Sequence, residues 1–400
     1  MSAPLRVLTC GAGAPWESHF VRGAGTLTPR VEVVRRCVDH GELLGVALRD
    51  RPDAVIVSSA VPWLDIELVA ALHGVGAVVL VVDDGSDRRW DAIGVDVILD
   101  AGGAPQSIAA ALHHLERGRP KEWAGARQDD TATPRAVRDD APAGRLIAVW
   151  GATGSPGRTT VAVELALEAT RSGIDTLLVD GDAHAASVAQ MLGLEETPCV
   201  THAAELVSGG RAESLADCLQ RHSSGVRVLA GLPHPDLWPE VREHAWRALL
   251  DAARRDAELV VVDLAASIEE DEELAFDAVP YRRNLMTLVA LDEADTIVLV
   301  AGADPVALRR SIVASRALEQ VRPRAVEKLT TVLNRVPRSA RHLQACSGAI
   351  SQWTGSPPRA LLPCEPAFER VVWDGRPLAR VAKKSPWLRE LRVFAEELTS

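Results

Sequence analysis

The sequence predicts an α/β protein built from two parallel-sheet units that are joined by a tether. Three observations predict this fold class: short β-branched runs recur along the chain, helix-like segments separate them, and residues 117–144 have almost nothing to bury. Strands that alternate with helices form a parallel sheet covered on both faces, because each crossover helix packs against the sheet. The 400 residues and the hydrophobic fraction of 47% suffice for more than one core.

Residues 1–116 form the first predicted unit. Its predicted strands are short and bounded by Gly, Asp or Pro: Leu5–Cys10, Val31–Val34, Asp53–Ser58, Ala77–Val82 and Val95–Leu99. Helices are predicted between these strands, notably at Leu64–His73, and after them at about Pro105–Glu116. In pattern and length this unit resembles a response-regulator receiver domain, which is flavodoxin-like.

The groups that a receiver uses for phosphorylation are missing from this unit. A receiver holds magnesium with an acidic pair after its first strand, where this chain has Thr9–Gly11. The third predicted strand ends in Ser58 instead of a phosphate-accepting aspartate, and Asp100–Gly102 stand where a receiver has its lysine. We therefore expect a pseudo-receiver that is not phosphorylated in the usual way and that contacts other proteins.

Residues 117–144 change character, because Pro, Gly, Ala and mixed charges replace the apolar runs. Such a composition predicts a flexible tether with no core of its own. At roughly 5–6 Å times the square root of its length, the tether reaches on the order of 30 Å.

Residues 145–400 form the second predicted unit. Its strands are predicted at Leu146–Trp150, Asp175–Asp180, Val226–Gly231, Glu258–Asp263, Asp295–Gly302 and Leu329–Asn334. Its helices are predicted at Arg158–Ser172, Pro239–Arg255, Pro305–Gln320 and Pro386–Leu398. The last helix carries apolar residues on one face and mixed charges on the other, so we expect it to dock on the core and not on a membrane.

A glycine-rich turn follows the first strand of this unit, in the stretch WGATGSPGRTT from Trp150 to Thr160. A strand, a glycine-rich turn and a helix N-terminus in this order can direct several backbone N–H groups at one phosphate. The candidate phosphate-binding residues are Gly154, Ser155, Pro156, Gly157, Arg158, Thr159 and Thr160. The strict GxxxxGK(S/T) pattern fails at its first glycine and at its lysine, so an ordinary glycine-rich turn remains the alternative.

Polar side chains end several later strands of the second unit. Asp180 ends one strand and Asp182 stands two positions later, Asp263 ends another strand, and Asn334 ends a late one. Nucleotide sites of open α/β sheets lie at this carboxyl edge. Each residue alone could be a strand-end cap, but the four in this order favour a nucleotide site.

The region from about 145 to 398 resembles the MinD/ParA family of deviant Walker A P-loop ATPases. The resemblance lies in the loop and in the stretches ADTIVLVAGADPVALRRS, LNRVPRS and LPCEPAFERVVWDGRPLAR. With the pseudo-receiver, the chain resembles the TadZ/CpaE proteins of Flp (Tad) pilus assembly and the septum-site-determining MinD-like proteins of actinobacteria. The resemblance implies ATP and Mg²⁺ bound between two protomers. It also implies Thr159 and Asp263 on Mg²⁺, Asp182 as the catalytic residue that positions the attacking water, and Asn334 on adenine.

The chain departs from this family at two loop positions. The family loop is KGGxGK(S/T); its first lysine, which reaches across the dimer, aligns with Thr153, and its second aligns with Arg158. The glycine of the usual D-x-x-G pattern after Asp263 is also absent. Arginine keeps the charge but donates in fixed directions, so we expect nucleotide binding to persist better than hydrolysis. If the missing lysine at Thr153 acts as an arginine finger does, its loss lowers the rate of hydrolysis by roughly a thousandfold or more.

Composition limits the remaining function classes. The net charge of −11 argues against a broad nucleic-acid surface, and no CxxC pair supports a zinc or iron–sulfur site. The N-terminus shows no secretion signal, and the longest nearly apolar run, Leu68–Val82, is too short to span a bilayer. We therefore expect a cytoplasmic protein without a transmembrane segment, held at the membrane or cell pole, if at all, through partners.

Three functions are compatible with these sequence features. The first is an ATP-binding spatial regulator that dimerises on nucleotide and positions a pilus or division machine at the inner membrane face. The second is a scaffold that binds nucleotide without hydrolysing it, or binds none. The third, a ParA-like DNA-segregation ATPase, is disfavoured by the acidic balance and by Thr153.

Overall fold

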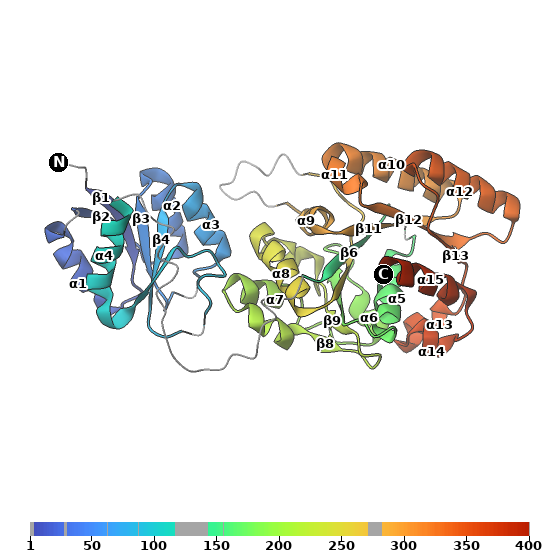
Figure 1. The fold of residues 1–400 in the computed structure, drawn as a ribbon, viewed down its shortest axis with the longest axis horizontal. Coiled ribbons are helices and arrows are strands. Elements are labelled where there is room, and N and C mark those ends of the chain that lie inside the picture. The colour runs from blue at the N-terminus through green and yellow to red at the C-terminus, as the bar shows by residue number, and fades with distance from the viewer. Residues whose placement is uncertain are drawn as a thin grey trace. The chain divides into compact units, whose positions relative to one another are not determined.

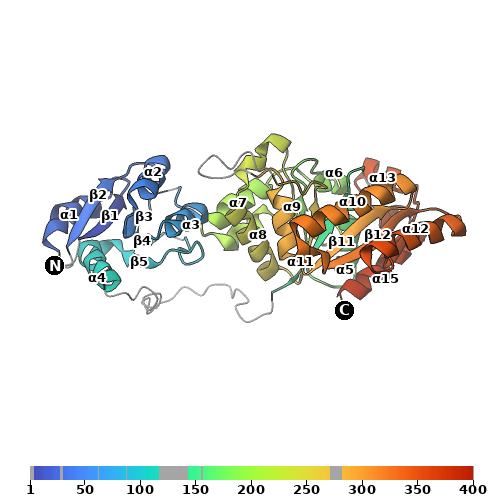
Figure 2. The ribbon, with the colours of Figure 1, turned by 90° about the horizontal axis from the view of Figure 1, so that it is seen from above.

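The computed structural model describes residues 4–27, 30–61, 63–86, 88–116, 143–154, 156–270 and 282–399. These residues form two compact units, each with its own sheet (Figures 1 and 2). The predicted tether, except for its last two residues, and the candidate residue Ser155 lie outside the described residues.

The N-terminal unit contains a five-stranded parallel sheet in the order β2-β1-β3-β4-β5. This 2-1-3-4-5 order is the one found in doubly wound sheets such as flavodoxin. The strands are β1 (Leu5–Cys10), β2 (Val31–Arg36), β3 (Ala54–Ser58), β4 (Val78–Asp83) and β5 (Val97–Asp100). The helices are α1 (Pro15–Gly23), α2 (His40–Asp50), α3 (Ile66–Gly74) and α4 (Ala104–Glu116).

Side chains that alternate along these strands build two cores, one on each face of the sheet. Leu8 packs with α2 and α3, whereas its neighbour Val7 packs with α1 and α4. Because successive strand residues point to opposite faces, a continuous apolar run is the expected pattern for a sheet that is covered on both sides.

The carboxyl edge of this sheet holds a closed polar network around Glu17, a residue that no sequence pattern singled out. One Glu17 carboxyl oxygen accepts hydrogen bonds from Thr9 Oγ1 at 2.6 Å and from Gly11 N at 3.2 Å. The other oxygen pairs with Arg36 at 2.7 Å. The Glu17 carboxylate therefore has charge and hydrogen-bond partners within the unit and does not depend on a cation.

The C-terminal unit contains an eight-stranded sheet in the order β13-β12-β11-β6-β10-β7-β9-β8, in which only β8 pairs antiparallel. The inner strands are β6 (Arg145–Trp150), β7 (Thr176–Gly181), β10 (Leu259–Leu264), β11 (Thr296–Gly302) and β12 (Leu329–Val336). The outer strands are β8 (Gln220–Arg221), β9 (Arg227–Leu229) and β13 (Ala360–Pro363).

Helices cover both faces of this sheet (Figure 1). One face carries α5 (Arg158–Arg171), α6 (Val188–Leu192), α13 (Phe368–Asp374), α14 (Leu378–Val381) and α15 (Pro386–Thr399). The other face carries α8 (Glu243–Asp256), α9 (Leu285–Glu293), α10 (Pro305–Val321) and α12 (Ala340–Thr354). The short helix α11 (Pro323–Val326) also belongs to this unit, as does α7 (Val200–Ser208) up to Glu205.

The predicted docking of the C-terminal helix on the core is confirmed. Leu388, Leu391 and Ala395 are buried in the core cluster that also contains the inner face of α5. Trp387 and Phe394 of the same helix are also buried in this cluster.

Two predicted elements of this unit were wrong in extent, and two strands were missed. The strand predicted at Val226–Gly231 covers only Arg227–Leu229. The helix predicted from Pro239 begins at Glu243, because Pro239 lies in a 3-10 turn and Val241 is extended. Strands β8 and β13 are two and four residues long, too short for a periodicity to be recognised.

Helix α5 buries a carboxyl group whose titration has a consequence for stability. Glu164 is fully buried; one of its oxygens accepts from Leu378 N at 2.7 Å, and the other has no partner among the described residues. Burial raises the pKa of Glu164 from 4.5 to about 7. Between these pH values the folded protein binds a proton that the unfolded chain has lost, so the free energy of unfolding falls as the pH rises.

We expect Glu164→Gln to be more stable than the parent protein at about pH 8, by as much as about 3 kcal/mol. The amide keeps the shape and the acceptor of the carboxyl group but cannot ionise, so most of the difference disappears at about pH 5. Urea unfolding followed by circular dichroism at both pH values measures the effect. Glu195→Gln, at an exposed position, serves as the control. A difference between parent and Glu164→Gln that is independent of pH would contradict the titration.

Candidate nucleotide site

The glycine-rich loop between β6 and α5 has the backbone path of an anion-binding turn. Gly154 has φ +101° and Gly157 has φ +99°, which L-residues rarely adopt. Gly157 is the N-cap of α5, so the first N–H groups of a 14-residue helix open onto the loop. The carboxyl edge of the sheet thus presents a helix N-terminus at the position where the sequence predicts the phosphate.

Arg158, which replaces the loop lysine, folds back onto its own loop. Its Nη1 atom donates to the carbonyl oxygens of Gly151 and Ala152 at 3.2 and 3.0 Å. Its Nη2 atom lies 3.6 Å from Asp182 Oδ2. The buried Nε atom has no hydrogen-bond partner within the described residues. Arg158 therefore braces the loop and still has one donor to offer.

Three aspartates lie at the same edge of the sheet. In the parallel pairing of β10 with β7, Asp263 stands opposite Asp180. Asp180 accepts hydrogen bonds from the backbone N–H groups of Asp182, Ser187 and Val188. Asp182 Oδ1 accepts from His184 N and Ala185 N, both at 2.9 Å. All three carboxyl groups are buried, and Asp180 and Asp182 serve partly to hold the chain that follows β7.

Burial raises the pKa of Asp180 and of Asp263, because their hydrogen bonds and nearby cations offset the loss of hydration only in part. Burial, with a contribution from the neighbouring Asp182, raises the pKa of Asp180 to about 6, against the lowering effect of its three backbone hydrogen bonds. Burial and then the Asp180 carboxylate raise the pKa of Asp263 well above its ordinary value. Thr159 and Arg158 oppose this rise only in part. A cation beside Asp263 would favour its ionised form.

The site fits a Mg²⁺–phosphate group better than it fits an apolar occupant. Neither carboxyl oxygen of Asp263 has a hydrogen-bond partner of ordinary geometry within the described residues, and the hydroxyl of Thr159 lies nearby. The orphaned Nε of Arg158 has the opposite character, since it needs an acceptor. Unpaired buried polar groups of both kinds are costly, and a metal with its phosphate oxygens would supply a partner to each.

Asn334 is held by a network that the sequence did not predict. Its Nδ2 donates to Pro156 O in the loop at 2.8 Å. Its Oδ1 accepts from Trp387 Nε1 on α15 at 3.0 Å, and also from Arg335 N at 3.0 Å. Asn334 is buried and directly contacts the loop, so it positions Gly157 and its neighbours. Its predicted contact with adenine stays a prediction.

His184 and Asn284 form a second pair that the sequence did not predict. His184 Nε2 lies 2.9 Å from Asn284 Oδ1, and Asn284 Nδ2 donates to Glu269 O at 2.8 Å. The two residues are 100 positions apart in the chain, and no local pattern joins them. Together they tie the segment after β7 to the segment after β10, next to Asp182.

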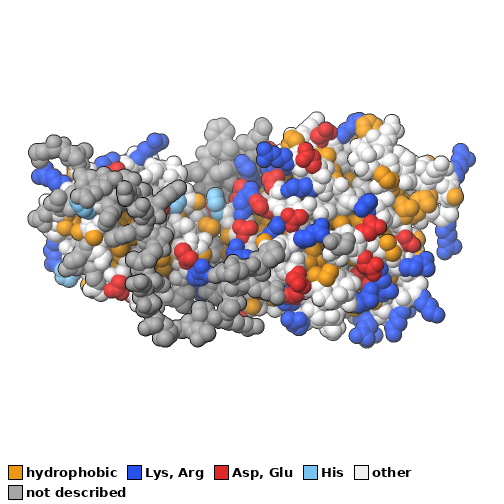
Figure 3. All heavy atoms as spheres, in the orientation of Figure 1, with side chains coloured by type: hydrophobic (Ala, Val, Ile, Leu, Met, Phe, Trp, Pro, Cys, Tyr) orange, Lys and Arg blue, Asp and Glu red, His pale blue; other side chains and the backbone are white. Residues whose placement is uncertain are grey.

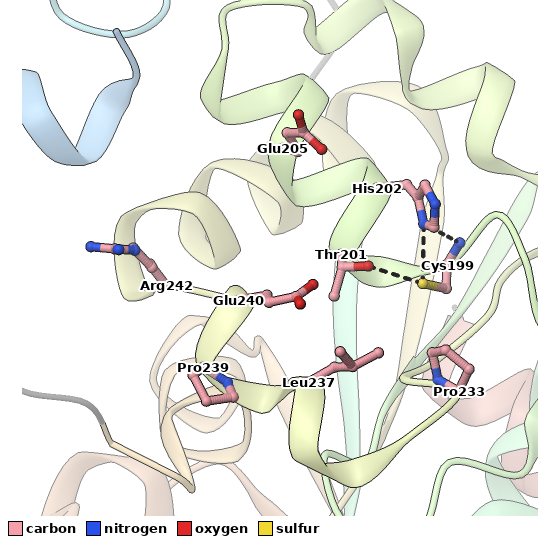
Figure 4. A pocket seen from close by; sticks show the side chains of 9 residues that line it. All are labelled: Cys199, Thr201, His202, Glu205, Pro233, Leu237, Pro239, Glu240 and Arg242. Atoms are coloured by element: carbon pink, nitrogen blue, oxygen red, sulfur yellow. Dashed lines mark hydrogen bonds between the residues drawn. The ribbon is translucent and has the colours of Figure 1, made fainter. Parts of the chain in front are cut away.

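A separate pocket of about 670 Å³ lies between α7 and the segment around the 3-10 turn at Pro235–Glu240 (Figure 4). The buried thiol of Cys199 lies 3.1 Å from Thr201 Oγ1 and 3.2 Å from His202 Nδ1. These groups satisfy one another. Within the described residues, no cluster of three His, Cys, Asp or Glu side chains is arranged to hold a metal ion.

One face of the C-terminal unit, seen in Figure 3, carries both basic and acidic side chains. Basic and acidic side chains intermingle over the middle of this face, and basic side chains gather along its lower right edge. In the described part of the chain, every helix is too short or too polar to cross a bilayer.

No protein-family model matches the chain. An uncharacterised protein of Mycobacterium tuberculosis is 30% identical over 218 residues, which are 54% of this chain and 56% of that protein. The match thus spans about half the length of this curated relative. An uncharacterised ATP-binding protein of Methanocaldococcus jannaschii is 20% identical over 252 residues, which are 63% of this chain and 86% of that protein.

Solved structures show the fold. A ParA family ATPase of Chlorobium tepidum matches with TM-score 0.54 and 18% identity, over 64% of this chain and 99% of its own. The cell division ATPase MinD of Pyrococcus furiosus matches with TM-score 0.51 and 21% identity, over 64% of this chain and 98% of its own. The septum site-determining protein MinD of Pyrococcus horikoshii, complexed with Mg-ADP, matches with TM-score 0.50 and 19% identity, over 64% and 96%. The predicted α/β fold with a mostly parallel sheet is confirmed, and it is the fold of these solved structures.

Proposed function

We propose that the C-terminal unit binds MgATP at the loop between β6 and α5. The observation that carries this proposal is the pair of buried, orphaned groups of opposite character, the Asp263 carboxyl and the Arg158 Nε, beside a helix N-terminus. In this proposal Thr159 and Asp263 hold Mg²⁺. The loop residues Gly154 to Thr160 surround the phosphates, and Asp182 lies where it can orient an attacking water. Hydrolysis is weak, because Thr153 offers no cation.

We further propose that nucleotide makes the protein a dimer and that this dimer positions a cell-envelope machine, either Flp/Tad pilus assembly or a septum site. The support is the likeness to fold relatives that are described as cell division, septum-site and ParA family ATPases. The protein would act in the cytoplasm and reach the inner membrane face through partners. A DNA-segregation role is disfavoured by the net charge of −11 and by the uncharged Thr153.

The N-terminal unit is, in this proposal, a pseudo-receiver that docks partner proteins. Its Glu17–Arg36 ion pair and the hydrogen bond from Thr9 neutralise the edge where a receiver needs a free acidic pair. A unit of this kind would keep the receiver surface without its phosphorylation chemistry.

Calorimetry tests the nucleotide proposal. We expect the parent protein to bind ATP and ADP in the presence of Mg²⁺, and Arg158→Ala to bind ATP at least about tenfold more weakly, because the variant loses both the loop brace and the free donor. Light scattering on the same samples should show the mass double only with ATP. No binding by the parent protein, at a constant mass, would refute the proposal.

A scaffold without nucleotide turnover is the second candidate, and the pose of Arg158 favours it. A guanidinium that donates to Gly151 O and Ala152 O cannot follow the phosphate as a flexible lysine does. ATP binding with an unchanging mass and no phosphate release would select this candidate.

A further inference from the structure

A second arginine reaches the phosphate loop from another helix. Arg310 lies on α10, which begins directly after β11, and β11 is the strand next to β6. Because parallel strands end at one edge, the start of α10 and the glycine-rich loop come to the same side of the sheet. Asp304 caps α10 by accepting from Val306 N and Ala307 N, which fixes how the helix leaves the edge.

The guanidinium of Arg310 rests on Gly154. A Cβ atom at Gly154 would touch Arg310 Nη1 and would lie only 3.3 Å from Arg310 Cζ. A side chain at this position would displace the end of the Arg310 side chain, and the left-handed backbone of Gly154 independently favours glycine. The glycine and the arginine therefore act as a pair that brings a cation onto the loop.

Arg310 has no carboxylate to neutralise it among the described residues. The ion pairs of these residues do not include Arg310, and its side chain is exposed. Arg158, by contrast, has its charge directed at loop carbonyls and at Asp182. Thr153, next to Gly154, carries no charge. Arg158 is thus engaged by groups of the protein, whereas Arg310 keeps a charge that no described carboxylate neutralises.

We infer that Arg310 is a phosphate-contacting residue that supplies, from within the same chain, the mobile positive charge that the loop lacks. The inference rests on the proposed binding of nucleotide at this loop. The planar fork of arginine suits phosphate oxygens, and a guanidinium at the solvent edge can turn from Gly154 to a bound phosphate. The affinity for nucleotide would then depend on α10, although the loop sequence alone gives no sign of it.

The test compares Arg310→Ala, Arg310→Lys and Arg309→Ala by calorimetry with MgATP and MgADP. Arg309 is the neighbouring exposed arginine on the same helix and provides a matched control for net charge. We expect Arg310→Ala to weaken MgATP binding by about 10- to 100-fold, Arg310→Lys to restore part of the loss, and Arg309→Ala to bind like the parent. The thermal midpoint without nucleotide should be the same in all four proteins, since both arginines are exposed.

Three results would overturn the inference. Parent-like affinity in Arg310→Ala would show that the guanidinium does not contact the nucleotide. Tighter binding in Arg310→Ala would show that it blocks the loop. Equal losses of MgATP affinity in Arg310→Ala and Arg309→Ala would show that the effect comes from the net charge of the protein and not from a contact of Arg310. In all three cases the parent protein still binds nucleotide, so the proposed function survives; if the parent binds neither ATP nor ADP, both proposals fall.

Discussion

Asp263→Asn is expected to stabilise the nucleotide-free protein and at the same time to remove most of the effect of Mg²⁺ on ATP binding. Asp263 is fully buried, and Asp180 lies opposite it on β7. Among the described residues, the carboxyl oxygens of Asp263 have no hydrogen-bond partner of ordinary geometry, with the Thr159 hydroxyl nearby. The raised pKa of Asp263 means that the folded state either keeps a proton or ionises at a cost. An amide avoids both, so we expect the free energy of unfolding at neutral pH to rise by about 1–3 kcal/mol.

The same change removes the only anionic oxygen pair that is buried without partners at this edge, within the described residues. Substitutions in the outer shell of metal sites cost about 10- to 100-fold in affinity, so loss of a direct ligand should weaken MgATP binding by about 100-fold or more. Calorimetry with and without Mg²⁺ measures the loss of ATP affinity, and urea unfolding measures the gain in the free energy of unfolding. Asp251→Asn, at an exposed position on α8, is the control. Unchanged MgATP affinity in Asp263→Asn would exclude Asp263 as a magnesium ligand.

Trp387→Ala is expected to lower the free energy of unfolding by about 3–5 kcal/mol, as other large-to-small aromatic substitutions in cores do. Trp387 is almost fully buried, and its ring packs edge-on against Phe368 at 4.8 Å between centroids. Its Nε1 atom also donates to Asn334 Oδ1, and Asn334 in turn donates to Pro156 O in the loop. Because whole domains are stable by only about 5–15 kcal/mol, this variant alone would mix unfolding with loss of function.

Trp387→Phe separates the two effects. It keeps most of the packing but removes the N–H donor, so we expect a loss of about 1–2 kcal/mol in stability and of about tenfold in ATP affinity, because Asn334 is less firmly oriented. Denaturation by urea and calorimetry with MgATP give the two numbers. Trp353→Phe, at a half-exposed tryptophan on α12 that stacks with Arg316, should change neither. Full ATP affinity in Trp387→Phe would mean that Asn334 holds the loop without help from α15.

The buried strands and the loop could be predicted from the sequence, because their signals are local. A parallel strand covered on both faces needs a continuous β-branched run, which Leu259–Leu264 and Thr296–Gly302 provide. Asp180 and Asp263 could be expected at one edge because parallel strands begin and end together, and they do stand in register. The start of α8 was predicted wrongly because proline is common in the first turn of a helix, whereas Pro239 lies in a 3-10 turn that precedes α8.

The contacts that shape the site could not be predicted, because they join distant segments. Asn334 meets Trp387 across 53 positions and Pro156 across 178. Arg310 lies in a stretch that served only to support the family resemblance and that no sequence pattern assigned to the site. Its contact with Gly154 arises because β6 and β11 are neighbours in the sheet. Glu17 was overlooked for a similar reason, since a lone glutamate in a helix usually faces solvent.

The hydrogen bonds from α15 through Asn334 to the loop couple the end of the chain to whatever the loop binds. Coupling free energies are reciprocal: if an ordered α15 favours an occupied loop, then an occupied loop must hold α15 in place by the same amount. If the loop binds nucleotide as proposed, a change that displaces residues 386–399 should weaken that binding, and bound nucleotide should protect these residues from displacement. The C-terminal helix and the loop would then each stabilise the ordered form of the other.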